Sequence, residues 1–304
     1  MKLFIVYAAV EDRQQVWPDK RSLPLQRVAG SNVLGHVLNQ LREVQARELI
    51  VVVERDKEAV AAWIEDNIPQ IEAKVIAVAG GLNPLQALAS CREHFDNEPL
   101  LVALGNTVTE ADYKNLEQST AGVTLFTLPQ QAETGLPWAG ICHFRQGTDL
   151  YAALEDALQT GGTDFISLLT NLQQRDLYIE ERPAMMCLDT RTSENLLIAN
   201  ARLLGLGFGS EDAIERSYVE DFTVLPPVFL HETAVIENAV IGPFANIEAG
   251  ARISGSIVRS SLIGKESTID NAILDGSIIG SRAHVIASGH TLIVEDNEEI
   301  SLTS

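Results

Sequence analysis

The chain has 304 residues, of which 46% are hydrophobic and 6% aromatic, with 42 acidic against 22 basic side chains. This length suits two domains better than one, and the hydrophobic share excludes disorder along most of the chain because it can build buried cores. The formal charge of −20 disfavours polyanionic partners, because phosphate backbones and anionic lipid headgroups would be repelled. We therefore expect neither nucleic acid nor a membrane surface as a partner.

The three cysteines, Cys91, Cys142 and Cys187, are far apart and odd in number. They fit neither a disulfide framework nor a CxxC metal knuckle, so reduced, buried thiols are expected. The apolar start of the chain is interrupted at Glu11, which leaves it too short to span a membrane, and it carries no small-residue cleavage pattern. These features predict a buried first strand and a cytoplasmic protein.

Up to about Leu204 the sequence alternates short, β-rich apolar runs with longer amphipathic stretches. The runs predict strands over 3–9, 48–53, 74–78, 100–104, 123–128, 139–144 and 176–180. Aliphatic residues at helical spacing predict helices over 32–44, 57–68, 84–95 and 193–204. Apolar strands separated by helices indicate an α/β, Rossmann-like domain with a mostly parallel sheet covered on both faces. Ligands of such sheets bind at the carboxyl ends of the strands.

A glycine-rich segment over 205–210 follows the last predicted helix of this domain, and Pro226-Pro227 comes soon after. Glycines and prolines in this arrangement end a helix and begin a flexible joint. The sequence therefore predicts an α/β domain over 1–204, a linker over 205–227 and a second domain over 228–304.

After Pro227, aliphatic residues recur at steps of five or six residues. Grouped in threes, the steps superpose, so that Ile247, Ile263 and Ile279 are 16 residues apart. This pattern predicts a left-handed parallel β-helix of hexapeptide repeats, in which each coil buries its aliphatic core against the next. The open ends of such a prism favour capping or oligomerisation. We expect residues 294–299 to form an acidic, partly frayed end.

Three stretches carry a resemblance to a known family: Val28-Ala29-Gly30 with the helix that follows it, the segment Cys187–Asn200, and Leu225–Phe229 with Val240–Ala245. Together with the order of the two domains, they resemble the sugar-1-phosphate nucleotidyltransferases, particularly the long glucose-1-phosphate thymidylyltransferase-like type. The resemblance covers nearly the whole chain and implies a GT-A type first domain. It also implies the transfer of a nucleotidyl group from a nucleoside triphosphate to a sugar 1-phosphate, with pyrophosphate leaving and with Mg²⁺ held by carboxylates.

The glycine-rich loop that the family places after its first strand is changed here. The run that aligns with "AAGxGTRLxP" begins Ala8-Ala9-Val10, and Glu11 and Asp12 follow. Glycine lets the backbone approach phosphates, whereas valine and two carboxylates obstruct and repel them. Arg13 is the remaining cation of the loop. Ala8, Ala9 and Val10 are therefore the remnant of a nucleotide-binding loop.

The family's phosphate-binding lysine is also missing, because Leu23 stands where the lysine of the "PK" motif falls. Lys20 or Arg21 substitutes for it if the loop shifts, and otherwise both are solvated loop cations. If the chain is active, Arg13 and Lys20 are the candidate catalytic residues.

The metal-binding positions are only partly retained. Asn106 replaces the family's first metal carboxylate after Gly105, and Asp189 aligns with the second. An amide oxygen can ligate a hard cation but removes one full charge from the site, so Asn106 either binds metal or only closes the turn. Asp189 is likewise open between a metal ligand and a helix cap or a partner of Arg191.

The sugar-binding side is shortened. The segment between Asn106 and Trp138 is shorter than the family's usual span and lacks its "EKP" motif. Gly80-Gly81 aligns with the turn that recognises the base in the family, and Gly81 and Gly105 complete the nucleotide-binding remnant. Glycines before a helix are also ordinary turn residues.

These departures predict a catalytically degenerate protein with a regulatory or scaffolding role in nucleotide-sugar metabolism. It would bind a nucleotide or nucleotide sugar, and would form a homo-oligomer or pair with an active relative through the β-helix. The first alternative is an active transferase with rearranged motifs, in which case Mg²⁺ is the cofactor; otherwise none is expected. The second is a β-helix acyltransferase, for which His284 is the candidate base. The sugar, the base and the oligomer size stay open.

Overall fold

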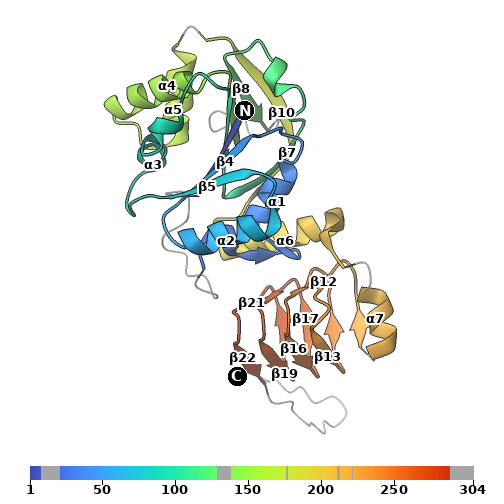
Figure 1. Ribbon diagram of the computed structural model, residues 1–304. Coiled ribbons are helices and arrows are strands. Elements are labelled where there is room, and N and C mark those ends of the chain that lie inside the picture. Colours follow the sequence, from blue (N-terminus) through green and yellow to red (C-terminus); the bar gives the residue numbers. More distant parts are fainter. Residues whose placement is uncertain (8–20, 129–137, 176, 211–212, 221, 288–304) are drawn as a thin grey trace, which may run out of the picture. The chain divides into compact units, whose positions relative to one another are not determined.

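The computed structural model in Figure 1 describes residues 1–7, 21–128, 138–175, 177–210, 213–220 and 222–287. The chain divides into two units, Met1–Leu206 and Gly207–Ser304. The division falls inside the segment 205–227 that the sequence predicts as a linker.

The first unit is built on an eight-stranded sheet with the order β5-β4-β1-β6-β9-β8-β10-β7. Only β9 and β7 run antiparallel to the others. The strands are β1 (Lys2–Val6), β4 (Glu48–Val53), β5 (Glu72–Ala77), β6 (Leu100–Leu104), β7 (Thr107–Ala111), β8 (Val123–Thr127), β9 (Trp138–Phe144) and β10 (Ile179–Asp189). The mostly parallel sheet predicted from the sequence is confirmed.

Helices cover both faces of this sheet, as Figure 1 shows. Helices α3 (Pro84–Ala89), α4 (Gly147–Gln159) and α5 (Phe165–Gln173) share one hydrophobic core with it. On the other face lie α1 (Val33–Gln40), α2 (Lys57–Asn67) and α6 (Ser193–Leu203). Short 3-10 turns form at η1 (Leu23–Leu25), η2 (Arg92–His94) and η3 (Leu116–Gln118). Burial on both faces explains why the central strands are continuous apolar runs.

Two of the stretches that carry the family resemblance meet in space. Strands β2 (Arg27–Val28) and β3 (Ser31–Asn32) form a tight hairpin, whose turn places Ala29 and Gly30 at positive φ angles. The side-chain oxygen of the fully buried Asn200, on α6, accepts a hydrogen bond of 3.0 Å from the backbone N–H of Ala29. This bond ties the last long helix of the unit to the turn that precedes its first.

The second unit is a left-handed parallel β-helix whose three faces are four-stranded parallel sheets. Their strands are β11 (Thr223–Val224), β14 (Val240–Ile241), β17 (Ile257–Arg259) and β20 (Ile273–Asp275); β12 (Phe229–Leu230), β15 (Asn246–Ile247), β18 (Leu262–Ile263) and β21 (Ile278–Ile279); and β13 (Val235–Glu237), β16 (Arg252–Ser254), β19 (Thr268–Asp270) and β22 (His284–Ile286).

The stacking inside the β-helix follows the predicted repeat. Ile247 pairs with Ile263 and Ile263 with Ile279, in the register given by their 16-residue spacing. Several corners between strands use residues other than glycine at positive φ, among them Ser260 (47°), Glu266 (57°) and Arg282 (58°). The predicted acidic end over 294–299 lies outside the described residues.

A helix covers the first coil of the β-helix. Helix α7 (Ala213–Glu220) packs against β11, and Ala213 belongs to the core of the coils. The guanidinium of Arg216 donates hydrogen bonds to the carbonyl oxygens of His231 (3.0 Å) and Ala234 (3.1 Å). The first strand of the coil thus begins at Thr223, within the segment predicted as linker, because α7 and β11 take up that segment.

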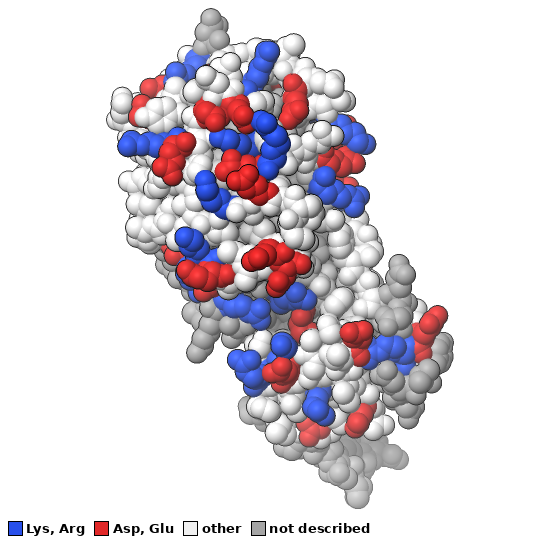
Figure 2. Space-filling model, viewed as in Figure 1, with Lys and Arg blue, Asp and Glu red and all other residues white. Residues whose placement is uncertain are grey.

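The surface in Figure 2 intermixes acidic and basic side chains and shows no broad basic patch on that face. Within the described part of the chain, no helix is long and apolar enough to cross a membrane.

One buried histidine lies inside the sheet of the first unit. His143, on β9, is 1% exposed, and neither ring nitrogen has a hydrogen-bond partner among the described residues. Its cross-strand neighbour is Thr124 on β8. Burial, reinforced by the charge of Arg182, lowers the pKa of His143 to about 4, against the opposing effect of Glu117 and Glu180. The ring is therefore neutral in the folded protein at neutral pH.

This burial predicts acid sensitivity. The pKa of His143 in the folded protein lies below the ordinary value of 6.5, so below pH 6.5 the unfolded chain binds a proton that the folded chain does not. The contribution to stability that is present above pH 6.5 is therefore lost as the pH falls toward 4. Replacement of His143 by Leu should remove part of this loss, measured as the urea unfolding free energy at pH 8 and pH 5. Thr124→Val, which removes no titratable group, is the control. Equal pH dependence in wild type and His143→Leu would contradict the assignment.

Candidate functional site

The candidate site is the edge of the sheet at which β1, β4, β5, β6 and β10 all end, where ligands of parallel sheets bind. Of the residues singled out from the sequence, the structure places Gly81, Gly105 and Asn106 in loops that follow these strands, and Asp189 at the last position of β10. The other candidates lie outside the described residues: Ala8, Ala9, Val10, Arg13 and Lys20.

The ends of β1 and β6 are packed against each other through Tyr7 and Gly105. The N–H of Gly105 donates to the carbonyl oxygen of Val6 at 2.9 Å. A β-carbon at Gly105 would lie 2.5 Å from the ring carbons of Tyr7, whose side chain is buried. Glycine is therefore needed here because a ring packs on its backbone, which is a requirement of packing rather than of phosphate binding.

Asn106 closes the turn from β6 into β7. The backbone N–H and the hydroxyl of Thr190 both donate to the carbonyl oxygen of Asn106, at 2.9 and 3.0 Å. The Asn106 side chain is buried, and its Oδ1 atom has no hydrogen-bond partner among the described residues. A buried acceptor without a partner destabilises the fold by about 1–3 kcal/mol. The orphaned oxygen is therefore an unusual feature of this edge.

The pairing of β7 with β10 brings the two predicted metal positions together. Thr107, which follows Asn106, lies opposite Asp189 in the antiparallel register. Thr190, next to Asp189, makes the two hydrogen bonds to Asn106 described above. The structure thus places the two positions near each other, while their role as ligands stays a prediction.

The carboxylate of Asp189 is engaged by Arg191. The guanidinium donates from Nε to Oδ1 at 3.1 Å and from its terminal nitrogen to Oδ2 at 2.7 Å, and the backbone N–H of Arg191 donates to Oδ1 at 2.9 Å. Thr192, not Asp189, caps helix α6 by accepting from the N–H of Asn195. Of the two non-metal alternatives left open by the sequence, the structure has the pair with Arg191.

The glycine turn after β5 leads into helix α3. Gly81 has a φ angle of +94°, which side chains rarely adopt. Asn83 then caps the helix, since its side chain accepts from the N–H of Gln86 and the Gln86 side chain accepts in return. The described contacts of this turn are those of an ordinary helix start.

The donors of this edge differ from those of a magnesium site that serves a triphosphate. Mg²⁺ takes carboxylate oxygens together with phosphates. Here the pair consists of one amide oxygen and one carboxylate already bound by a guanidinium. No group of three His, Cys, Asp or Glu side chains able to hold a metal occurs in the described ranges. Among the described residues, the donors at this edge do not fit the ion that the family resemblance implies.

The segment between Asn106 and Trp138 that was predicted to be shortened contains β7, η3 and β8, and its last part, 129–137, lies outside the described residues. The indole N–H of Trp138 donates to the carbonyl oxygen of Ile141 at 2.8 Å, and the ring stacks on Phe165 with centroids 5.1 Å apart. These contacts fix Trp138 in the core of the first unit.

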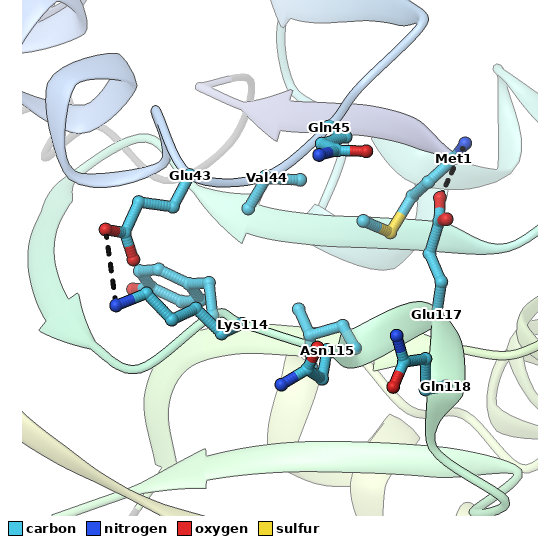
Figure 3. Close-up of a pocket in the computed structure, with 10 residues that line it drawn as sticks. Met1, Glu43, Val44, Gln45, Lys114, Asn115, Glu117 and Gln118 are labelled. Carbon is cyan, nitrogen blue, oxygen red and sulfur yellow. Dashed lines mark ion pairs between the residues drawn. The ribbon is translucent and has the colours of Figure 1, made fainter.

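A pocket of about 290 Å³ lies at the opposite edge of the sheet, where β1 begins and β7 ends (Figure 3). Its charged groups are paired with one another. Lys114 lies 3.7 Å from Glu43, and the amino group of Met1 lies 3.3 Å from Glu117. A triphosphate would need an excess of positive charge, and this balanced lining does not offer one.

The acyltransferase candidate, His284, lies on β22 in the last described coil, where its side chain is exposed. Sequence reasoning did not identify Tyr7 or Thr190, which hold the edge together. The only signal for either was its position beside a strand end.

No family model matches the sequence, and no curated protein matches it either. Solved structures do match. HddC from Yersinia pseudotuberculosis is 13% identical, with a TM-score of 0.50, and the match covers 66% of this chain and 99% of that one. A putative glucose-1-phosphate thymidylyltransferase from Bacillus anthracis, solved in complex with a sucrose, is 12% identical with a TM-score of 0.57, covering 69% and 97%. At these identities the likeness shows the fold.

The packing of Tyr7 on Gly105 can be tested by a double-mutant cycle. Gly105→Ala should lower the unfolding free energy by about 1–3 kcal/mol, because the added methyl overlaps the ring. In a Tyr7→Leu background the same change should be less harmful. Gly205→Ala is the control, since nothing lies within 4 Å of its β-carbon position. Additive losses in the cycle would show that the ring does not occupy this space.

Proposed function

We propose that this chain is a catalytically silent relative of the sugar-1-phosphate nucleotidyltransferases, with a regulatory or scaffolding role in nucleotide-sugar metabolism. The observation that carries the proposal is the Asp189–Arg191 ion pair beside Asn106. In this lineage the two positions would supply carboxylates to a metal ion. Here one is an amide, and the other is neutralised by its neighbour.

The electrostatic reason is the charge of the reaction. Transfer of a nucleotidyl group passes through a transition state with several negative charges, which enzymes of this type balance with metal ions and cations. Of the two predicted metal positions only Asp189 carries a carboxylate, and releasing it for a metal would break its hydrogen bonds from the Arg191 guanidinium. The pair is partly exposed, and such ion pairs contribute about 0–1 kcal/mol, so it weakens metal binding only modestly, in addition to the missing carboxylate at Asn106.

The fold supports the assignment to this lineage. An α/β unit followed by coils, together with the structural likeness to a putative thymidylyltransferase, agrees with the resemblance of the sequence. On this proposal the first unit keeps a nucleotide or nucleotide sugar as its ligand, without Mg²⁺. The β-helix joins the chain to further copies or to an active relative.

One observation favours a rival, an active transferase with rearranged motifs. The Oδ1 atom of Asn106 lies on the same edge as Asp189 and is an acceptor without a hydrogen-bond partner in the described part of the chain. In that case Asn106 and Asp189 would hold Mg²⁺, which supplies charge neutralisation at the phosphates, while Arg13 and Lys20 would bind the phosphates. The two proposals make opposite predictions for the unmodified protein.

The first test is direct. Purified protein incubated with each nucleoside triphosphate, Mg²⁺ and a set of sugar 1-phosphates should release no pyrophosphate above the background set by omitting protein, because one metal position is an amide and the other is paired with Arg191. A working thymidylyltransferase measured in parallel shows that the assay responds. Turnover comparable with that enzyme would refute the silent assignment and establish the rival.

The second test rebuilds the site. We expect Asn106→Asp combined with Arg191→Ala to gain Mg²⁺-dependent binding of a nucleoside triphosphate by at least tenfold, measured by calorimetry, because the turn before β7 and the end of β10 would then each carry a free carboxylate. Asn97→Asp, which adds the same charge at the other edge of the sheet, should gain nothing. The rival predicts instead that the wild type already binds nucleotide with Mg²⁺ and that the variant changes little.

A further inference from the structure

Strand β5 ends the sheet of the first unit, and its outer edge is not paired with any described strand. The N–H of Val78 donates to the carbonyl oxygen of Val53 on β4 at 2.9 Å. Backbone groups of alternate residues point to opposite sides of a strand. Those of Glu72, Lys74 and Ile76 therefore point toward β4, and those of Ala73, Val75 and Ala77 point to the open edge.

An apolar groove runs along this edge. A cavity of about 370 Å³ lies between α2 and β5, and its aliphatic lining includes Ile64, Ile68, Pro69, Ile71, Ala73 and Val75. An open strand beside an apolar groove is a site at which another strand can add to a sheet.

The opposite face of β5 carries one acidic and one basic side chain, which could pair with the same two residues of a second copy. Glu72 and Lys74 share this face because they are two residues apart. The Nζ atom of Lys74 lies 3.8 Å from Oε1 of Glu48 on β4. The side chains of Lys74 and Glu72 are both exposed. A lysine on an edge strand ordinarily discourages pairing, unless the incoming strand brings an acidic residue to it.

Every two-fold axis that passes through a residue of β5 agrees with the direction of the free backbone groups, and axes at Ala73, Lys74 and Val75 differ in the residue that they place opposite Lys74. A two-fold axis at Lys74 would place this lysine opposite the partner's Lys74, and an axis at Val75 would place it opposite the partner's Ile76. An axis at Ala73 places Lys74 opposite the partner's Glu72, and the reverse pair forms by symmetry. Opposite charges across antiparallel strands stabilise the pairing and like charges weaken it, so the third register is favoured.

We propose that β5 pairs antiparallel with β5 of a second copy of this chain, about a two-fold axis at Ala73. Ala73 then exchanges both backbone hydrogen bonds with the partner's Ala73, and the two sheets become one. The aliphatic groove of each copy receives the partner's Val75. This contact is separate from any association through the β-helix and does not depend on whether the site is silent.

Charge reversal tests the register. By sedimentation velocity over a range of micromolar concentrations, the wild type should form dimers. Lys74→Glu alone, or Glu72→Lys alone, should weaken the dimer roughly tenfold or more, because two attractive pairs become repulsive. The double variant Glu72→Lys/Lys74→Glu should restore it, and it keeps a lysine beside Glu48. Circular dichroism and thermal melting show whether each variant is folded.

Cross-linking tests the position of the axis independently. In a Cys187→Ser background, chosen because the other two native thiols are buried, Ala73→Cys should give a covalent dimer with a short bis-maleimide. The Ala77→Cys control should not, since its two thiols would lie about 27 Å apart at 3.4 Å per residue. A monomer at every concentration, a dimer indifferent to Lys74→Glu, a double variant that stays monomeric, or equal cross-linking at both positions would each overturn the proposal.

Discussion

The antiparallel pairing of β7 with β10 is the constraint on which the candidate site depends. It places Thr107 opposite Asp189, and so brings the turn after β6 against the loop before α6. The two hydrogen bonds that Thr190 donates to the carbonyl oxygen of Asn106 hold the turn and the loop together. The edge would keep this geometry whether or not it carried out chemistry, because backbone groups form the β7–β10 pairing and one of the two hydrogen bonds to Asn106. Chemistry can therefore be lost from the side chains while the architecture persists.

On the proposal of a silent site, the two positions lose their chemistry in different ways. At Asn106 an amide stands in place of a carboxylate, and its buried Oδ1 has no hydrogen-bond partner among the described residues. At Asp189 the charge stays but is satisfied within the chain by Arg191. The second change is the more thorough, because a salt-bridged carboxylate is stable without a metal, whereas an orphaned acceptor is not. A protein that keeps such a fold without the chemistry has to derive its use from binding, which is the basis of the role proposed for it.

The sequence predicted much of the fold because strong periodicities determine it. In the β-helix, a repeat of aliphatic residues defines the register directly, and the stack of Ile247, Ile263 and Ile279 formed as predicted. Helix α4 was not predicted, and its start carries no side-chain cap and opens on Gly147, so the usual start signal is absent. The packing of Tyr7 on Gly105 was also not foreseen, since periodicity gives the face of a residue but not its neighbour on another strand. The pairing of Asp189 with Arg191 was one of three roles that the local sequence allowed for Asp189, and the sequence offered no reason to prefer it.

The corners of the β-helix limit the stability of the second unit. Ser260, Glu266 and Arg282 hold a left-handed backbone, which L-residues with a Cβ adopt at a disadvantage of about 1–2 kcal/mol each. Most of the inward aliphatics are already buried, the exceptions being mainly Leu274, Ile279 and Val285 toward the last described coil, so little further improvement is available in the earlier coils. The second unit can therefore gain thermal stability mainly at its corners. A change to glycine or asparagine there relieves backbone strain and leaves the buried aliphatic core unchanged.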